Sequence, residues 1–339
     1  MNGFPRYTIS NRAPSATRTT LQETAALRAG NGKSSTDRVP GQESSLGWGQ
    51  GLRAAPKARD DGGMNAQLHA LAFEVLARVS ENRAPRESPQ LLGCREGLCL
   101  LRTPDGLKEV AADQLPAKVD LSPLIDHTIL KPAALAAEID QLCDEALEYE
   151  FASVCVNPYW VPRCARRLEG SPVRVCTVIG FPLGANTTRI KAEEAKEAVA
   201  CGAREVDMVL AVGLAKAGDW ESVRRDYRAV REAAPTATLK VILETCLLTD
   251  EEKAQASRIA AEENLDFVKT STGFSTGGAT EADVRIMRET VGARAGVKAS
   301  GGVRTYEDAL RMVLAGATRL GLSSSLAVAK GGSAQGGGY

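Results

Sequence analysis

Short apolar runs alternate with helical stretches through the later part of the chain. Eight runs rich in Val, Ile, Leu and Ala occupy residues 124–130, 151–158, 173–180, 204–210, 238–245, 266–273, 296–302 and 319–325. Continuous apolar character is typical of strands in a parallel sheet, where a helix after each strand covers the outer face. Eight such units predict an α/β fold in which the strands close into a (β/α)8 barrel, a TIM barrel.

Capping residues mark where the intervening helices begin and end. Thr249, Thr280 and Thr305 are each followed three residues later by an acidic residue, as in a capping box. Gly202 and Gly316 stand where two helices should end. A doubly wound open sheet is the alternative architecture. The strand count and the lack of a glycine-rich dinucleotide motif after the first strand favour the barrel.

The chain before the barrel shows different patterns. Residues 1–63 are rich in Ser, Thr, Arg, Gly and Pro without periodic apolar positions, so we predict a disordered extension. An organelle-targeting peptide is the alternative, which the acidic residues in this stretch disfavour. Residues 64–120 form a further extension, in which a helical apolar spacing from Met64 to Val79 predicts one amphipathic helix.

The rest of that extension, LLGCREGLCLLRTPDGLKEV, has two apolar runs beside turn residues and predicts a small hairpin that packs on the barrel or on a second subunit. The barrel itself should span residues 121–330, and residues 331–339 should form a flexible glycine-rich tail. Folds of this kind often pair through their outer helices, so a homodimer is an open alternative.

Composition narrows the function classes. Lys+Arg and Asp+Glu both number 42, so no overall charge favours nucleic acid or an anionic membrane as a partner. No apolar run has the length of a membrane span and no secretory signal is evident, so we expect a soluble, cytoplasmic protein. Among eight cysteines and two histidines, only Cys94 and Cys99 are close in sequence, and no second pair completes a zinc site.

Charged residues interrupt several of the apolar runs, where burial without a partner would be costly. Lys269 and Lys298 are each the third or fourth residue of neighbouring runs, and Asp207 lies two strands away. Two crowded ammonium groups favour the loss of one proton, which would leave a nucleophilic amine, and an adjacent carboxylate can move protons. The structural alternatives are lysines that reach water at strand ends and a simple buried salt bridge between Asp207 and Lys269.

Glycine and serine residues follow the last three strands. They are Gly273, Gly301, Gly302, Gly321, Ser323 and Ser324. Loops after the last strands of this fold often bind phosphate, because glycine exposes backbone N–H groups and serine adds hydroxyl donors. Tight turning alone is the alternative. With the lysines, these residues predict carbonyl chemistry on a small phosphorylated substrate.

Six segments resemble the deoxyribose-phosphate aldolase family of DeoC type, over residues 121–330. They are IDHTILKP, VCVNP, VIGFPLGANTT, EVDMVL, FVKTSTGF and VKASGGVRT. The resemblance implies a class I aldolase that reversibly cleaves 2-deoxy-D-ribose 5-phosphate, in deoxyribonucleotide catabolism, to D-glyceraldehyde 3-phosphate and acetaldehyde. It also implies that no metal or organic cofactor is needed.

The same resemblance assigns roles to residues. It implies that Lys269 forms the Schiff base, that Lys298 favours the neutral form of that amine, and that Asp207 relays protons. The six glycine and serine positions named above would then hold the phosphate. Some members carry a lysine where this chain has Phe274, and some end in a tail whose terminal tyrosine reaches the site, as Tyr339 could. Another lysine-dependent aldolase, a transaldolase-like enzyme and a non-catalytic barrel that binds sugar phosphates stay open as alternatives.

Overall fold

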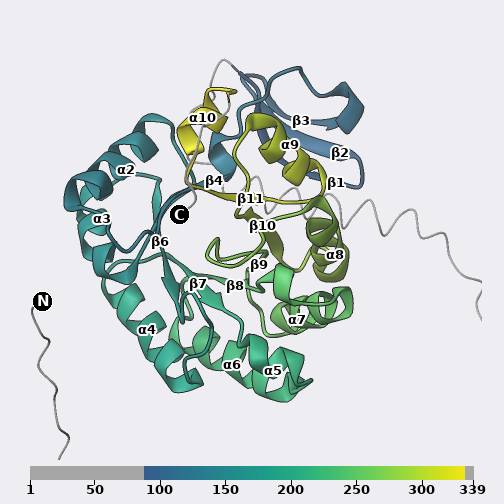
Figure 1. Ribbon diagram of the computed structural model, residues 1–339. Helices are drawn as coiled ribbons and strands as arrows, with labels where there is room; N and C mark the ends of the chain where they lie inside the picture. Colours follow the sequence, from purple (N-terminus) through teal and green to yellow (C-terminus); the bar gives the residue numbers. More distant parts are fainter. Residues whose placement is uncertain (1–87, 333–339) are drawn as a thin grey trace, which may run out of the picture. The chain divides into compact units, whose positions relative to one another are not determined.

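Eight parallel strands close into a barrel in the computed structural model, which describes residues 88–332. The strands are β4 (Ile125–Ile129), β5 (Ser153–Val156), β6 (Arg174–Ile179), β7 (Glu205–Val209), β8 (Thr238–Ile242), β9 (Phe267–Lys269), β10 (Gly296–Ser300) and β11 (Arg319–Leu322). They pair in chain order, and β11 pairs with β4 to close the ring (Figure 1). The predicted TIM barrel is confirmed.

Helices lie outside the ring of strands (Figure 1). They are α2 (Ala136–Glu148), α3 (Val161–Arg167), α4 (Thr188–Ala200), α5 (Val212–Lys216), α6 (Trp220–Ala233), α7 (Asp250–Glu262), α8 (Glu281–Val291), α9 (Tyr306–Leu314) and α10 (Ser325–Ala329). Thr249 and Thr305 form complete capping boxes at α7 and α9. Gly202 and Gly316 follow α4 and α9 with φ of 109° and 114°, as helix-ending glycines do.

The strands divide the interior into two layers. Alternate residues such as Val206, Leu239 and Val297 are buried against the outer helices and belong to the main apolar core. The residues between them point the other way, because side chains alternate along a strand. These include Asp207, Lys240 and Lys298, which are equally buried. The inside of the barrel is therefore largely polar, and it is here that a site must be sought.

The predicted strand runs extend beyond the observed strands at their carboxyl ends. The run 266–273, for instance, contains only three strand residues, Phe267–Lys269. The remaining residues form the loop after β9. The predicted residues that lie beyond the strand ends therefore belong to the edge of the barrel where the active site of this fold lies.

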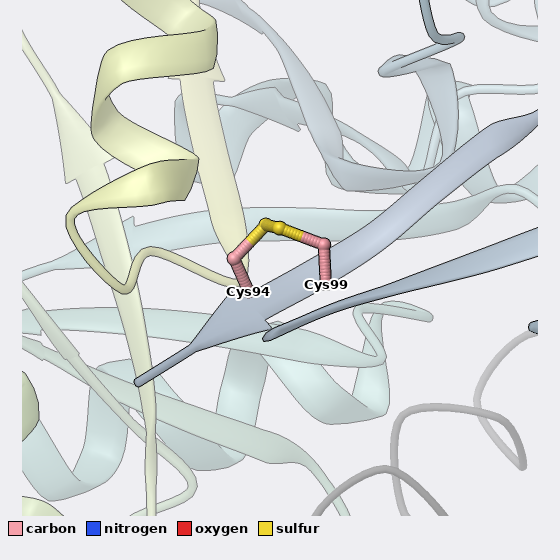
Figure 2. The surroundings of a disulfide bond; sticks show 2 residues. All are labelled: Cys94 and Cys99. Carbon is pink, nitrogen blue, oxygen red and sulfur yellow. A yellow bond between two sulfur atoms is a disulfide. The ribbon is translucent and has the colours of Figure 1, made fainter. Parts of the chain in front are cut away.

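A separate antiparallel sheet precedes the barrel in the order β1 (Gln90–Arg95), β2 (Leu98–Thr103) and β3 (Gly106–Ala111). The expected hairpin is therefore extended by a third strand. A disulfide joins Cys94 of β1 to Cys99 of β2 (Figure 2), a link that the sequence interpretation did not include. The Leu91 N–H donates to the Asp120 carbonyl at 2.9 Å, and Leu91 is buried in the main core.

Several expectations concern residues outside 88–332. These are the disordered extension over 1–63, the helix from Met64 to Val79 and the role of Tyr339. Within the described range, no helix is both long enough and apolar enough to cross a membrane. The same range also contains four short 3-10 turns, at Ala112–Gln114, Ser122–Leu124, Pro158–Trp160 and Thr245–Leu247.

Candidate active site

Three buried side chains meet inside the barrel. The ammonium groups of Lys269 and Lys298 both donate to the same oxygen of Asp207, Oδ2, at 2.9 and 2.8 Å. None of the three side chains is more than 2% exposed. The two amines therefore face one another across a single carboxylate oxygen, which is the arrangement that crowding of like charges requires.

Strand register explains why these residues meet. Lys269 of β9 and Lys298 of β10 are directly paired, so their side chains leave the sheet side by side. Asp207 lies on β7, and β8 separates it from β9. Both lysine side chains extend far enough into the barrel to reach the Asp207 carboxylate.

The two lysines differ in their carboxylate partners. Lys298 also contacts Asp126 of β4 at 2.5 Å, whereas Asp207 is the only carboxylate in the described part of the chain that Lys269 contacts. Burial acts to lower the pKa of Lys298, but the charges of Asp126 and Asp207 outweigh it and raise that pKa well above its usual value. Lys298 therefore stays charged near neutral pH, and Lys269 is the less compensated of the two amines.

Asp207 stays ionised in this setting. Burial acts to raise the pKa of Asp207, but the neighbouring charges of Lys240, Lys269 and Lys298 hold it well below its usual range. Lys240, on β8, donates to the other oxygen, Oδ1, at 2.7 Å. Both carboxylate oxygens are thus bonded to ammonium groups.

Sequence reasoning did not select Lys240, Arg319 and Glu205, which complete the buried charged cluster. Lys240 contacts Glu205 at 2.6 Å, and Arg319 contacts Glu205 at 3.1 Å and Asp126 at 2.6 Å. The signal that could have found Lys240 and Arg319 is the one that identified Lys269, namely a cation within or next to an apolar strand run.

A cavity of about 240 Å³ opens at the carboxyl ends of β9, β10 and β11. It is lined by Gly273, Ser275, Thr276, Gly277, Gly278, Gly301, Gly302, Val303, Arg304, Gly321 and Ser323. Five of the six residues expected to hold phosphate are among these. Ser324 is not, and its carbonyl instead accepts the Val328 N–H in the first turn of α10. The sequence interpretation missed Arg304 and the glycines of the STGG segment.

Glycines allow the backbone to close around this cavity. A Cβ on Gly278 would lie 2.3 Å from the Gly301 carbonyl oxygen, so only glycine permits that approach. Gly301 and Gly302 both have positive φ, of 79° and 78°, which turns the chain sharply after β10. Gly321 links the cavity to the lysines, because a Cβ there would lie 3.0 Å from Cε of Lys298.

Glu244 secures the loop between Lys269 and the cavity. It is buried at the end of β8 in a left-handed conformation, with φ of 58°. Its carboxylate accepts the hydroxyl of Thr272 and, at 3.3 Å, the Thr272 N–H. Phe274, which follows Gly273, packs edge-on against Phe181 with ring centroids 5.3 Å apart.

Among residues 88–332, two groups of side chains have donor atoms close enough to hold a metal ion. They are Cys155 with Cys176 and Asp207, and Asp126 with Cys176 and Glu205. The carboxylates in both groups already bond to ammonium or guanidinium groups. A divalent cation would have to displace these buried cations, so the donor set does not fit a metal centre.

Comparisons with known proteins indicate the family. A family model described as DeoC/LacD family aldolase matches residues 122–331. A deoxyribose-phosphate aldolase of Brevibacillus brevis is 58% identical over 221 residues, which is 65% of this chain and 100% of the relative. One from Clostridium perfringens is 59% identical over 215 residues, covering 63% of this chain and 96% of the relative.

Solved structures give the same result. A putative deoxyribose-phosphate aldolase from Coccidioides immitis matches with a TM-score of 0.62 and 37% identity, covering 77% of this chain and 96% of that one. A deoxyribose phosphate aldolase from Aeropyrum pernix, described as tetrameric, matches with a TM-score of 0.58 and 33% identity, covering 62% of this chain and 89% of that one.

Proposed function

This chain belongs to the DeoC/LacD family of aldolases, and on that premise we propose that it reversibly cleaves 2-deoxy-D-ribose 5-phosphate to D-glyceraldehyde 3-phosphate and acetaldehyde. The observation that carries the proposal is the pair of buried amines, Lys269 and Lys298, that share one oxygen of Asp207. The names of the close relatives support the choice of substrate.

Lys269 is the nucleophile in this mechanism. Its neutral amine attacks C1 of the open-chain sugar, and the carbinolamine takes up a proton and loses water to give an iminium ion. Lys298 is held in its charged form by Asp126 and Asp207. A fixed cation beside the Lys269 amine disfavours a second positive charge there, which promotes the free-base form that the attack requires.

Cleavage breaks the bond between C2 and C3, because acetaldehyde carries C1 and C2 of the sugar. The C3 hydroxyl loses its proton, the C2–C3 electron pair moves into the iminium to give an enamine, and C3 becomes the aldehyde of glyceraldehyde 3-phosphate. Asp207 is the general base of this step, directly or through a water molecule. Return of the proton to C2 and hydrolysis of the resulting iminium release acetaldehyde.

The glycine-lined cavity holds the phosphate of the substrate. It lies at the carboxyl ends of the last three strands, and its lining includes Arg304 and the hydroxyl residues Ser275, Thr276 and Ser323. A guanidinium and several hydroxyl and backbone donors suit a phosphate. Gly321 borders both this cavity and Lys298, so a phosphate there would leave the carbon chain directed at the amines.

Trapping with borohydride tests the assignment of the nucleophile. Borohydride reduces an iminium to a stable secondary amine, so incubation with 2-deoxyribose 5-phosphate should leave one adduct, located by peptide mass spectrometry on Lys269. Lys269→Leu should abolish the adduct and the activity. A stable adduct on Lys298 instead would reverse the two roles.

Substrate profiling separates this proposal from its rivals. Another lysine-dependent aldolase or a transaldolase-like enzyme would also trap on a lysine, but it would prefer a donor other than acetaldehyde. We expect acetaldehyde to be the preferred donor in the synthetic direction. A barrel that only binds sugar phosphates would show neither an adduct nor turnover.

A further inference from the structure

Lys240 is a buried cation that the mechanism above does not use. Its ammonium lies between two carboxylates, 2.7 Å from Asp207 Oδ1 and 2.6 Å from Glu205 Oε2, and its side chain is fully buried. A buried charge carries a large desolvation cost unless it is paired. Its partner Asp207 is the proposed proton relay, so Lys240 bears directly on the site.

The ion pairs around Lys240 form a closed ring. From Glu205 the ring continues to Arg319 at 3.1 Å, from Arg319 to Asp126 at 2.6 Å, and from Asp126 to Lys298 at 2.5 Å. Lys298 then contacts Asp207 at 2.8 Å, which returns to Lys240. Three cations and three anions alternate around this ring. Lys269 lies outside it and, among the residues that the structure describes, is joined to it by an ion pair with Asp207 only.

Charge balance singles out Lys269. The six ring members neutralise one another, so a proton on Lys269 would give the whole buried cluster a surplus positive charge. Each ring cation contacts at least two carboxylates, whereas Lys269 contacts only Asp207, which the ammonium groups of Lys240 and Lys298 already contact. Of the four cations in the cluster, Lys269 is the one whose charge the surroundings compensate least.

The ring members hold their charges firmly. Burial opposes ionisation of Asp126, but Arg319, Lys298 and Lys240 keep its pKa well below the usual value. Burial likewise acts to lower the pKa of Lys240, and Asp207 together with Glu205 raises it above the usual value. Both shifts favour the charged forms, so the opposite charges of the ring balance near neutral pH.

We propose that Lys240 and Arg319 are positioning residues, which with Glu205 complete a neutral ring of buried charge and so make Lys269 the amine that gives up its proton. This inference rests on the proposed function and extends it. The pairing of Lys269 with Lys298 alone does not decide which of the two amines becomes neutral. The ring decides it, because Lys298 is a ring member and Lys269 is not.

Other titratable groups also face the cluster, among them Cys155 of β5 and Cys176 of β6. Burial, together with the hydrogen bond between the two cysteines, raises the pKa of Cys176 well above its usual value, whereas the same hydrogen bond lowers the pKa of Cys155. Glu244, at the end of β8, bonds to Thr272, and no ion pair joins it to the ring among residues 88–332. All eight strands thus contribute a side chain that touches or faces the cluster.

The proposal predicts shifts of opposite sign, which a merely structural role would not produce. Lys240→Met leaves a surplus anion, so Lys269 should keep its proton longer, and the acidic limb of kcat/KM against pH should move up by about one pH unit. Glu205→Gln leaves a surplus cation, so the same limb should move down by about one unit. The double variant Lys240→Met/Glu205→Gln restores the balance and should return the limb close to its original position.

Arg319→Lys keeps the charge and serves as the matched control, with no shift expected. If Lys240→Met does not fold, the sign of the Glu205→Gln shift and the unchanged limb of Arg319→Lys still decide the question. The proposal is refuted if Lys240→Met and Glu205→Gln shift the acidic limb in the same direction, or if neither variant shifts it. Trapping on Lys269 in the unsubstituted protein tests the proposed function separately, so a trapped adduct with unmoved limbs would refute this inference alone.

Discussion

Lys269 and Lys298 are paired residue to residue on neighbouring strands, and their ammonium groups donate to one oxygen of Asp207. Parallel strands lie about 5 Å apart, so paired lysines whose side chains point to the same side remain close along their length. The hydrogen bonds to their shared acceptor, Asp207 Oδ2, then hold the two ammonium groups in place. The electrostatics of the site depend on this pairing.

Two replacements of Lys298, one that removes its charge and one that keeps it, should show whether that charge controls the pH dependence of activity. Lys298→Leu removes the fixed cation beside Lys269, so we expect kcat/KM to fall by on the order of a hundredfold and its acidic limb to move to higher pH. Lys298→Arg retains a charge and should keep more of the original pH profile. The measurement is kcat/KM against pH. An unchanged profile in Lys298→Leu would remove Lys298 from the control of the Lys269 amine.

Gly321 should be needed for the position of Lys298. An added Cβ would lie 2.9 Å from Ser300 Cβ and 3.0 Å from Lys298 Cε, so Gly321→Ala should displace the lysine and cost about 1–3 kcal/mol of stability. We expect a clear loss of kcat as well. Gly213→Ala is the matched control, since it lies in α5 and nothing lies within 4 Å of an added Cβ. Equal activity in the two variants would contradict this account.

Arg304 should serve phosphate binding rather than chemistry. It lines the cavity with its backbone N–H held by Asp308 at 3.3 Å. Arg304→Gln removes the charge, so KM for 2-deoxyribose 5-phosphate should rise about tenfold or more, because a charge-assisted bond is lost. kcat and the cleavage of unphosphorylated 2-deoxyribose should change little. If both sugars lost activity equally, the cavity would not be the phosphate site.

The barrel could be predicted because its signal is local. Each strand appears as an apolar run and each helix has its own caps, so neither needs knowledge of distant residues. Lys269, Lys298 and Asp207 were conspicuous for the same reason, since each is a charge within an apolar run. Their convergence followed from the rule that strands of a barrel are neighbours in chain order.

The ring around Lys240 could not be derived in this way. Glu205 and Arg319 are 114 positions apart and meet only because the barrel closes. The third strand of the small sheet was missed because its residues are mostly exposed and its pattern is not apolar. The choice of Ser323 over Ser324 depends on the backbone at the end of β11, which spacing alone does not determine.

Acid should destabilise the protein through its buried carboxylates. Asp126 and Glu205 have folded-state pKa values below their usual ones, because the attraction of Arg319 and Lys240 outweighs burial. The unfolded chain therefore binds protons at a higher pH than the native state does. The stabilisation is complete above about pH 5 and is lost as pH falls towards the native values. Urea midpoints measured from pH 6 to pH 3 should fall, and less steeply in Glu205→Gln. A midpoint independent of pH would contradict the depressed values.

The disulfide between Cys94 and Cys99 should stabilise the small sheet without affecting the chemistry. It links β1 to β2 (Figure 2), joins cysteines that are five positions apart in sequence, and lies outside the barrel strands that carry the lysines. Closing so short a loop lowers the conformational entropy of the unfolded chain, which stabilises the folded protein by about 2 kcal/mol. A reducing agent should therefore lower the thermal midpoint and leave kcat unchanged. The double variant Cys94→Ala/Cys99→Ala is the control, because reductant should have no further effect on it. Equal melting of the unsubstituted protein with and without reductant would show that the bridge contributes nothing to stability.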